Sequence, residues 1–100
     1  MEELIYINRN KEDNCEIGKL TSNWETILSN YMTTHYVKCN TYEVHRHYFI
    51  AIDSVSDDTI DALNKANVTI YSIDRIVGFI SVKFNDEKAR DLVFNTLNKW

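Results

Sequence analysis

Segments with a helical repeat of apolar residues alternate with β-rich segments along the whole of this 100-residue chain. The order reads β-α-β-β-α-β-β-α, and each helical segment begins at a recognisable capping residue. Pro is absent and Gly occurs only twice, so no linker divides the chain. The pattern therefore predicts one domain, residues 1–100, in which helices pack on a sheet.

Capping signals mark the three predicted helices. The segment Ser22–Glu25 has the pattern of a capping box and precedes an apolar stripe that continues to about Thr34. Ser56 comes before two carboxylates, which the helix dipole favours in a first turn. Asn85 is the expected cap of a C-terminal helix. We expect these helices to bury one apolar face each.

The remaining segments are rich in β-branched and aromatic residues and predict strands. They are Leu4–Arg9, two strands within His35–Asp53, Val68–Ile73 and Val77–Phe84. Taking Asn40-Thr41 as the turn places Cys39 opposite Tyr42, with Val37, Cys39, Tyr42, Val44, Tyr48, Ile50 and Ile52 on the core face. His45, His47, Phe49 and Ala51 then share the other face. We expect an α+β, ferredoxin-like sandwich with three helices on one face of a mainly antiparallel sheet of about five strands.

Charge and composition disfavour several classes of protein. The net charge of −4 argues against a protein that mainly grips phosphate backbones. No apolar run approaches the roughly 18 residues of a membrane span, and the first residues do not resemble a signal peptide. Two cysteines are too few for a disulfide framework. We therefore expect a cytoplasmic protein with free thiols and no contact with membranes.

The histidines and one cysteine are considered as ligands of a metal site. His45 and His47 share a strand face, and His35 and Cys39 are near in sequence. In the expected register, however, Cys39 and His35 point to the opposite face. Cys39 is then a small buried hydrophobe rather than a nucleophile. We expect no metal, no cofactor and no catalytic residue, so the chain is interpreted as a non-enzyme.

The segment Val77–Phe84 resembles the RNP1 box of RNA-recognition-motif domains. Four positions match that box: Gly78, Phe79, Val82 and Phe84. Val77 replaces its basic residue and Ser81 its second stacking aromatic, and the segment Tyr48–Asp53 resembles the companion box, with Phe49 at the aromatic position. The resemblance implies single-stranded nucleic-acid binding by stacking on Phe49 and Phe79, which we keep as the alternative function.

The leading interpretation is a small binding protein that acts through protein–protein contact. The expected surface is the outer face of the sheet, opposite the helices, and it carries Tyr6, His45, His47, Phe49, Tyr71 and Phe79. Tyrosine supplies a large contact area and a hydrogen-bonding end at low entropic cost, and six of the twelve aromatic residues are tyrosines. A sheet face of this kind either docks on a partner or pairs with a second copy, so a homodimer stays open.

The negative charge points to a partner with a basic surface, because opposite charges speed the encounter. Compact acidic domains of this size without a recognisable site are frequent among phage and mobile-element proteins. Many of those inhibit a host nucleic-acid enzyme, as anti-CRISPR proteins do. This kind of inhibitor is the most concrete function that we expect from the sequence.

Overall fold

Strands and helices follow one another in the order expected from the sequence. The computed structural model describes residues 5–7 and 14–98. Its elements are β1 (Ile5–Ile7), the 3-10 helix η1 (Ile17–Lys19), α1 (Trp24–His35), β2 (Cys39–Val44), β3 (His47–Ile52), α2 (Asp57–Lys65), β4 (Ser72–Asp74), β5 (Phe79–Phe84) and α3 (Glu87–Leu97). The α+β class is therefore confirmed.

The helix starts lie close to the expected positions, but only one of the predicted caps forms. The Ser56 hydroxyl accepts a hydrogen bond of 3.2 Å from the amide of Thr59, as expected for α2. At α3 the cap is Asp86 rather than Asn85, because the Asp86 carboxylate accepts from the Ala89 amide at 3.0 Å. The predicted capping box before α1 is wrong, since the N-cap there is Asn23 and makes no side-chain cap bond.

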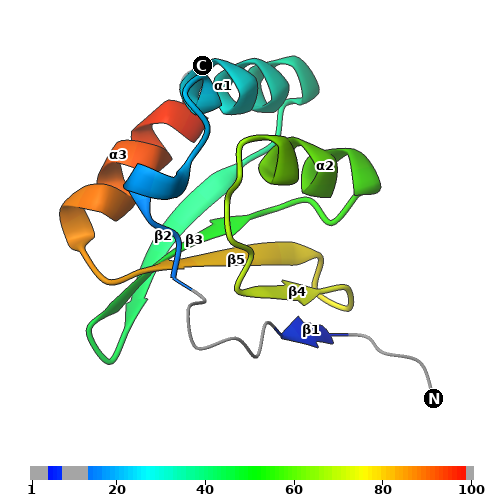
Figure 1. Ribbon diagram of the computed structural model, residues 1–100. Coiled ribbons are helices and arrows are strands. Elements are labelled where there is room, and N and C mark those ends of the chain that lie inside the picture. Colours follow the sequence, from blue (N-terminus) through cyan, green and yellow to red (C-terminus); the bar gives the residue numbers. More distant parts are fainter. Residues whose placement is uncertain (1–4, 8–13, 99–100) are drawn as a thin grey trace.

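Every pair of neighbouring strands is antiparallel, in the spatial order β1-β4-β5-β3-β2. The three helices lie on one side of this sheet (Figure 1). β3 and β4 run in the same direction with β5 between them, so β3-α2-β4 is a split β-α-β unit. The ferredoxin-like sandwich is not confirmed, because the strand beside β3 is the preceding hairpin strand β2 rather than one that follows α3.

The hairpin between β2 and β3 turns at His45-Arg46, so the predicted turn at Asn40-Thr41 is wrong. Val44 pairs with His47, and Tyr42 pairs with Phe49. Residues directly opposite each other in an antiparallel pair share a sheet face. Tyr42 and Val44 therefore lie with Phe49 on the face away from the helices, and not on the core face as expected.

Both turn residues have a left-handed backbone, with φ +50° at His45 and +65° at Arg46. Two consecutive residues with positive φ make the type I′ turn, whose twist matches that of a two-residue hairpin. Asn-Gly is the usual sequence there because side chains with a Cβ are strained in this conformation. The pair His-Arg gives no such signal, which is why the sequence did not reveal the turn.

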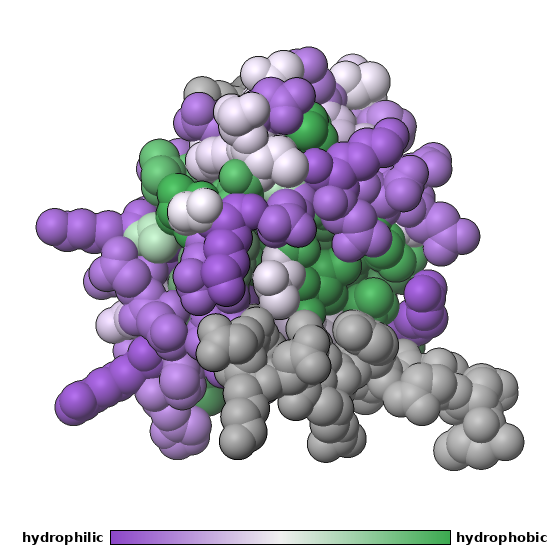
Figure 2. Space-filling view, in the orientation of Figure 1, coloured by the Kyte–Doolittle hydropathy of each residue, from purple (hydrophilic) through white to green (hydrophobic). Residues whose placement is uncertain are grey.

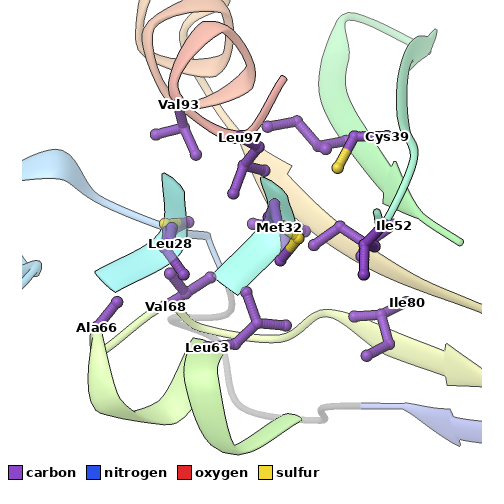
Figure 3. Packing of buried hydrophobic residues seen from close by; sticks show 14 of the residues in the cluster. Leu28, Met32, Cys39, Ile52, Leu63, Ala66, Val68, Ile80, Val93 and Leu97 are labelled. Atoms are coloured by element: carbon purple, nitrogen blue, oxygen red, sulfur yellow. The ribbon is translucent and has the colours of Figure 1, made fainter. Parts of the chain in front are cut away.

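The core lies between the helices and the sheet. Figure 3 shows side chains from all three helices converging on those of β2, β3 and β5. Members that are almost completely buried include Leu28, Met32, Ile50, Ile52, Leu63, Ile80, Val82, Phe84, Val93 and Leu97. Burial of these apolar side chains is the main stabilising contribution to such a fold. No helix in residues 14–98 is long and apolar enough to span a membrane.

We predict that Arg46→Gly stabilises the protein. Glycine adopts a positive φ without the strain that a Cβ causes, and the expected gain is about 0.5–1 kcal/mol in the free energy of unfolding. Urea unfolding measures the difference. Arg46→Ala is the matched control, because it removes the same long side chain but keeps the Cβ. Equal stabilities for the glycine and alanine variants would contradict the strained turn.

Candidate functional site

The sheet face away from the helices carries an aromatic cluster, which we define as Tyr42, Phe49 and Tyr71. The rings of Tyr42 and Phe49 stack with centroids 4.7 Å apart and an interplanar angle of 6°. Tyr71 contacts Phe49 edge-on at 5.5 Å, and the Lys83 ammonium lies 5.0 Å from the Tyr71 ring centre. These offset and edge geometries suit the quadrupoles of aromatic rings. The cluster forms a small second core on the open side of the sheet.

Phe49 occupies the expected face, but it is not an exposed platform. Only 6% of its surface is accessible. Ser81 is 1% accessible, and its hydroxyl lies 2.8 Å from the Tyr42 hydroxyl. A base can stack only on an exposed ring, so Phe49 would have to leave its packing to bind one. The burial of Phe49 therefore weighs against the stacking role that the RNA-recognition-motif resemblance implied.

Of the other residues of the predicted surface, Tyr71 contacts Phe49, and His47 lies on the same face of β3 as Phe49. Tyr71 and Phe79 are half-buried, and Phe79 lies on the open face opposite Asp74. His45 and His47 are exposed, but they belong to the hairpin tip. Tyr6 of β1 pairs with Ile73 of β4. The side chain of Tyr6 lies outside the described part of the chain.

The histidines and cysteines lie in separate places. His35 stacks on Tyr31 at 4.0 Å near the end of α1, away from the hairpin tip. In the part of the chain that the structure describes, no three His, Cys, Asp or Glu side chains gather closely enough to hold a metal ion.

Both thiols are buried and free. Burial raises the pKa of Cys15 from 9.0 to about 11, and the neighbouring charge of Glu16 adds to this rise. Burial likewise raises the pKa of Cys39 to about 12, with a further contribution from Asp53. A cysteine that acts as a nucleophile must be accessible, and its thiol must have a lowered pKa. Neither Cys15 nor Cys39 meets these conditions, so neither is suited to catalysis.

The loop between β4 and β5 exposes two aliphatic side chains. Ile76 is 68% accessible and Val77 is 72% accessible, among the most exposed large hydrophobic residues described. The Asp74 carboxylate accepts hydrogen bonds of 3.0 Å from the amides of both residues, and the Gly78 amide donates to the Asp74 carbonyl at 2.8 Å. Gly78 has φ +95°, which favours glycine. These bonds fix the loop before any partner binds.

One side chain of this loop contacts a segment that is rich in carboxylates. The Arg75 guanidinium donates to the carbonyl of Val55 at 3.4 Å, which brings the loop close to the start of α2. Asp53, Asp57 and Asp58 are all exposed in that region of the chain. We call Ile76, Val77, Asp53, Asp57 and Asp58 together the docking end. In Figure 2, hydrophobic side chains lie below the hydrophilic surface of α2, on the side where β4 runs.

A groove of about 430 Å³ lies between α1 and α2. Its polar lining includes Asp61 and Lys65, whose charged groups are 4.0 Å apart and well exposed. An open groove with a solvent-exposed ion pair does not enclose a small molecule, as ligand pockets do. The docking end is therefore the stronger candidate for function.

The docking end was not predicted from the sequence, because Val77 was expected to begin a strand. The available signal was an Asp four residues before Gly78, with two β-branched residues between them. Comparison with protein families, with curated proteins and with solved structures found no match to this chain. The function therefore has to be inferred from the residues themselves.

We predict that the protein loses stability in alkaline solution because of its thiols. The pKa of each thiol is higher in the folded than in the unfolded chain, so this contribution is complete below about pH 9 and falls as the pH rises towards 11 and 12. Urea unfolding at about pH 8 and about pH 10.5 measures the fall. The double variant Cys15→Ala, Cys39→Ala should lose less stability over this interval. An equal loss in both proteins would contradict the assignment.

We predict that the Tyr42–Ser81 hydrogen bond couples the two side chains energetically. Tyr42→Phe leaves the enclosed Ser81 hydroxyl without its partner, at a cost of about 1–3 kcal/mol. Ser81→Ala removes that hydroxyl, so the double variant should be less destabilised than the two single losses combined. Chemical denaturation of the four proteins gives the coupling. Strict additivity would show that the bond contributes nothing.

Proposed function

We propose that this protein is a small non-enzymatic binding protein that acts through contact between its docking end and another protein. The observation that carries the proposal is the ordered β4–β5 loop with Ile76 and Val77 exposed at its tip. Apolar side chains that are held in place before binding lose little entropy when they enter a pocket. They are suited to anchor an interface.

Charge supports a basic partner. Three exposed carboxylates lie in the segment around Val55, which the Arg75 side chain of the loop contacts, and the whole chain has a net charge of −4. An apolar anchor with an acidic rim complements an apolar pocket bordered by Lys and Arg. Within this class we propose an inhibitor of a host nucleic-acid enzyme, of the phage or anti-CRISPR type. The support for that finer proposal is the charge, since such enzymes present basic grooves.

Two further proposals concern the setting and the fold. The two free, buried thiols are compatible with a reducing compartment, so we place the protein in the cytoplasm. We also propose that the sheet is a rearranged form of the ferredoxin-like sandwich. β2 lies beside β3, where the strand after α3 would close such a sheet.

We predict that replacing the aliphatic tip removes partner binding. The variant Ile76→Ser, Val77→Ser keeps the Asp74 turn but loses the apolar anchor, so affinity should fall roughly tenfold to a hundredfold. The immobilised protein and its variants are compared in capture from the native host, and the dissociation constant is then measured with the purified partner.

Leu92→Ser is the matched control, because Leu92 is another exposed aliphatic residue, 46% accessible, on α3. Leu92→Ser should leave partner binding unchanged. Partner binding of the unmodified protein should weaken as salt is added. If the tip variant and the control retain the same proteins with the same affinity, the docking end is not the interface. Salt-sensitive binding of single-stranded RNA that is lost in Phe79→Ala would favour the alternative function instead.

A further inference from the structure

The outer edge of the sheet at β2 is open in the described part of the chain. β2 is the last strand in the sheet order and pairs only with β3 among residues 5–7 and 14–98. Cys39 is buried, but each of the next five residues is exposed. At the opposite edge, β1 has three residues, whereas β2 has six. β2 is therefore the longer edge strand in the described part of the chain.

The hydrogen-bond pattern shows which backbone groups face outwards. The Asp53 amide donates to the Lys38 carbonyl at 2.9 Å, and the two-residue turn makes Val44 and His47 a hydrogen-bonded pair. Hydrogen-bonded pairs recur at every second residue of an antiparallel ladder. The residues that bond to β3 are thus Lys38, Asn40, Tyr42 and Val44. The amide and carbonyl groups of Cys39, Thr41 and Glu43 point away from the sheet.

This edge has few of the features that usually prevent strand pairing. Natural edges are short, bulged or interrupted by Pro, or they carry several charges. β2 has six residues, pairs one-to-one with β3 without a bulge, and contains no Pro. Its one charged side chain is Glu43. The edge is a ready template for a further strand.

We propose that β2 pairs with β2 of a second copy of this chain, forming a two-fold symmetric dimer with a continuous sheet. The three outward-facing residues are spaced evenly about Thr41, so an antiparallel copy places Thr41 opposite Thr41 and Glu43 opposite Cys39. A closed two-fold interface uses the same surface on both copies, and this strand is complementary to itself.

Charge favours the antiparallel copy. The segment from Lys38 to Val44 has one basic residue at its start and one acidic residue, Glu43, near its end. Antiparallel pairing places Glu43 of each copy opposite the uncharged Cys39 of the other, so no like charges face each other. A parallel copy in the same register would place Glu43 opposite Glu43. The docking ends of the two copies stay free, because they lie outside β2.

The first test is the oligomeric state of the unmodified protein. Sedimentation velocity should show a monomer–dimer equilibrium that shifts to the dimer as concentration rises. Hydrogen exchange followed by NMR should show slower exchange of the Thr41 and Glu43 amides at high concentration. The Asn40 and Tyr42 amides, which bond to β3, should be protected at every concentration. A monomer at all concentrations would overturn the proposal.

Variants separate strand pairing from misfolding. Thr41→Pro removes an outward-facing donor and no bond to β3, so the fold should persist while the dissociation constant of the dimer rises at least about tenfold. Thr41→Val is the matched control, because it keeps the outward-facing amide donor and a β-branched side chain, so it should leave the dimer intact.

A dimer that withstands Thr41→Pro would rule out this interface. So would a monomer whose Thr41 and Glu43 amides become protected only when another protein is added, since the edge would then belong to that partner's strand. Each of these results is independent of the docking end, because the variants leave Ile76 and Val77 unchanged.

Discussion

Burial of the central strands on both sides of the sheet holds this small protein together. On one face, Ile50 of β3 and Val82 of β5 pack beneath the helices. On the other face, Phe49 is enclosed by the stacked ring of Tyr42 and the edge of Tyr71. A domain of this size buries only about 60–65% of its unfolded surface, so a second apolar cluster is a substantial addition to its core. The docking end and the open edge both depend on the rigid sheet that results.

The sequence was most informative where structure is decided locally. The apolar stripe of α2 and its cap at Ser56 are properties of neighbouring residues, and they appear in the fold as expected. The register of the β2–β3 hairpin was not predictable in the same way. It depends on a turn at His45-Arg46 whose backbone strain is compensated by long-range pairing with β5. Placing the turn elsewhere moved Tyr42 to the wrong face.

In the candidate site too, local features were predictable from the sequence and long-range features were not. Alternation along a strand correctly placed Phe49 on the face away from the helices. Its burial depends on Tyr42 and Tyr71, which are distant in sequence or on a mispredicted face, so its exposure was overestimated. The loop that exposes Ile76 and Val77 was not predicted for the opposite reason, since the exposure of these two residues was underestimated. Apolar residues next to a strand suggest burial, and only the hydrogen bonds of Asp74 show that the chain turns outwards there.

The double burial of β3 and β5 also determines how freely this sequence can change over time. A strand covered on one side accepts polar replacements at every second position, and β2, exposed at five consecutive residues, accepts still more. β3 and β5 have little such freedom, since consecutive residues such as Phe49 and Ile50 are both enclosed. Homologous sequences should therefore diverge fastest along β2 and the helix surfaces while retaining continuous apolar runs in the two central strands. Such runs are the feature by which distant relatives of this chain can be found.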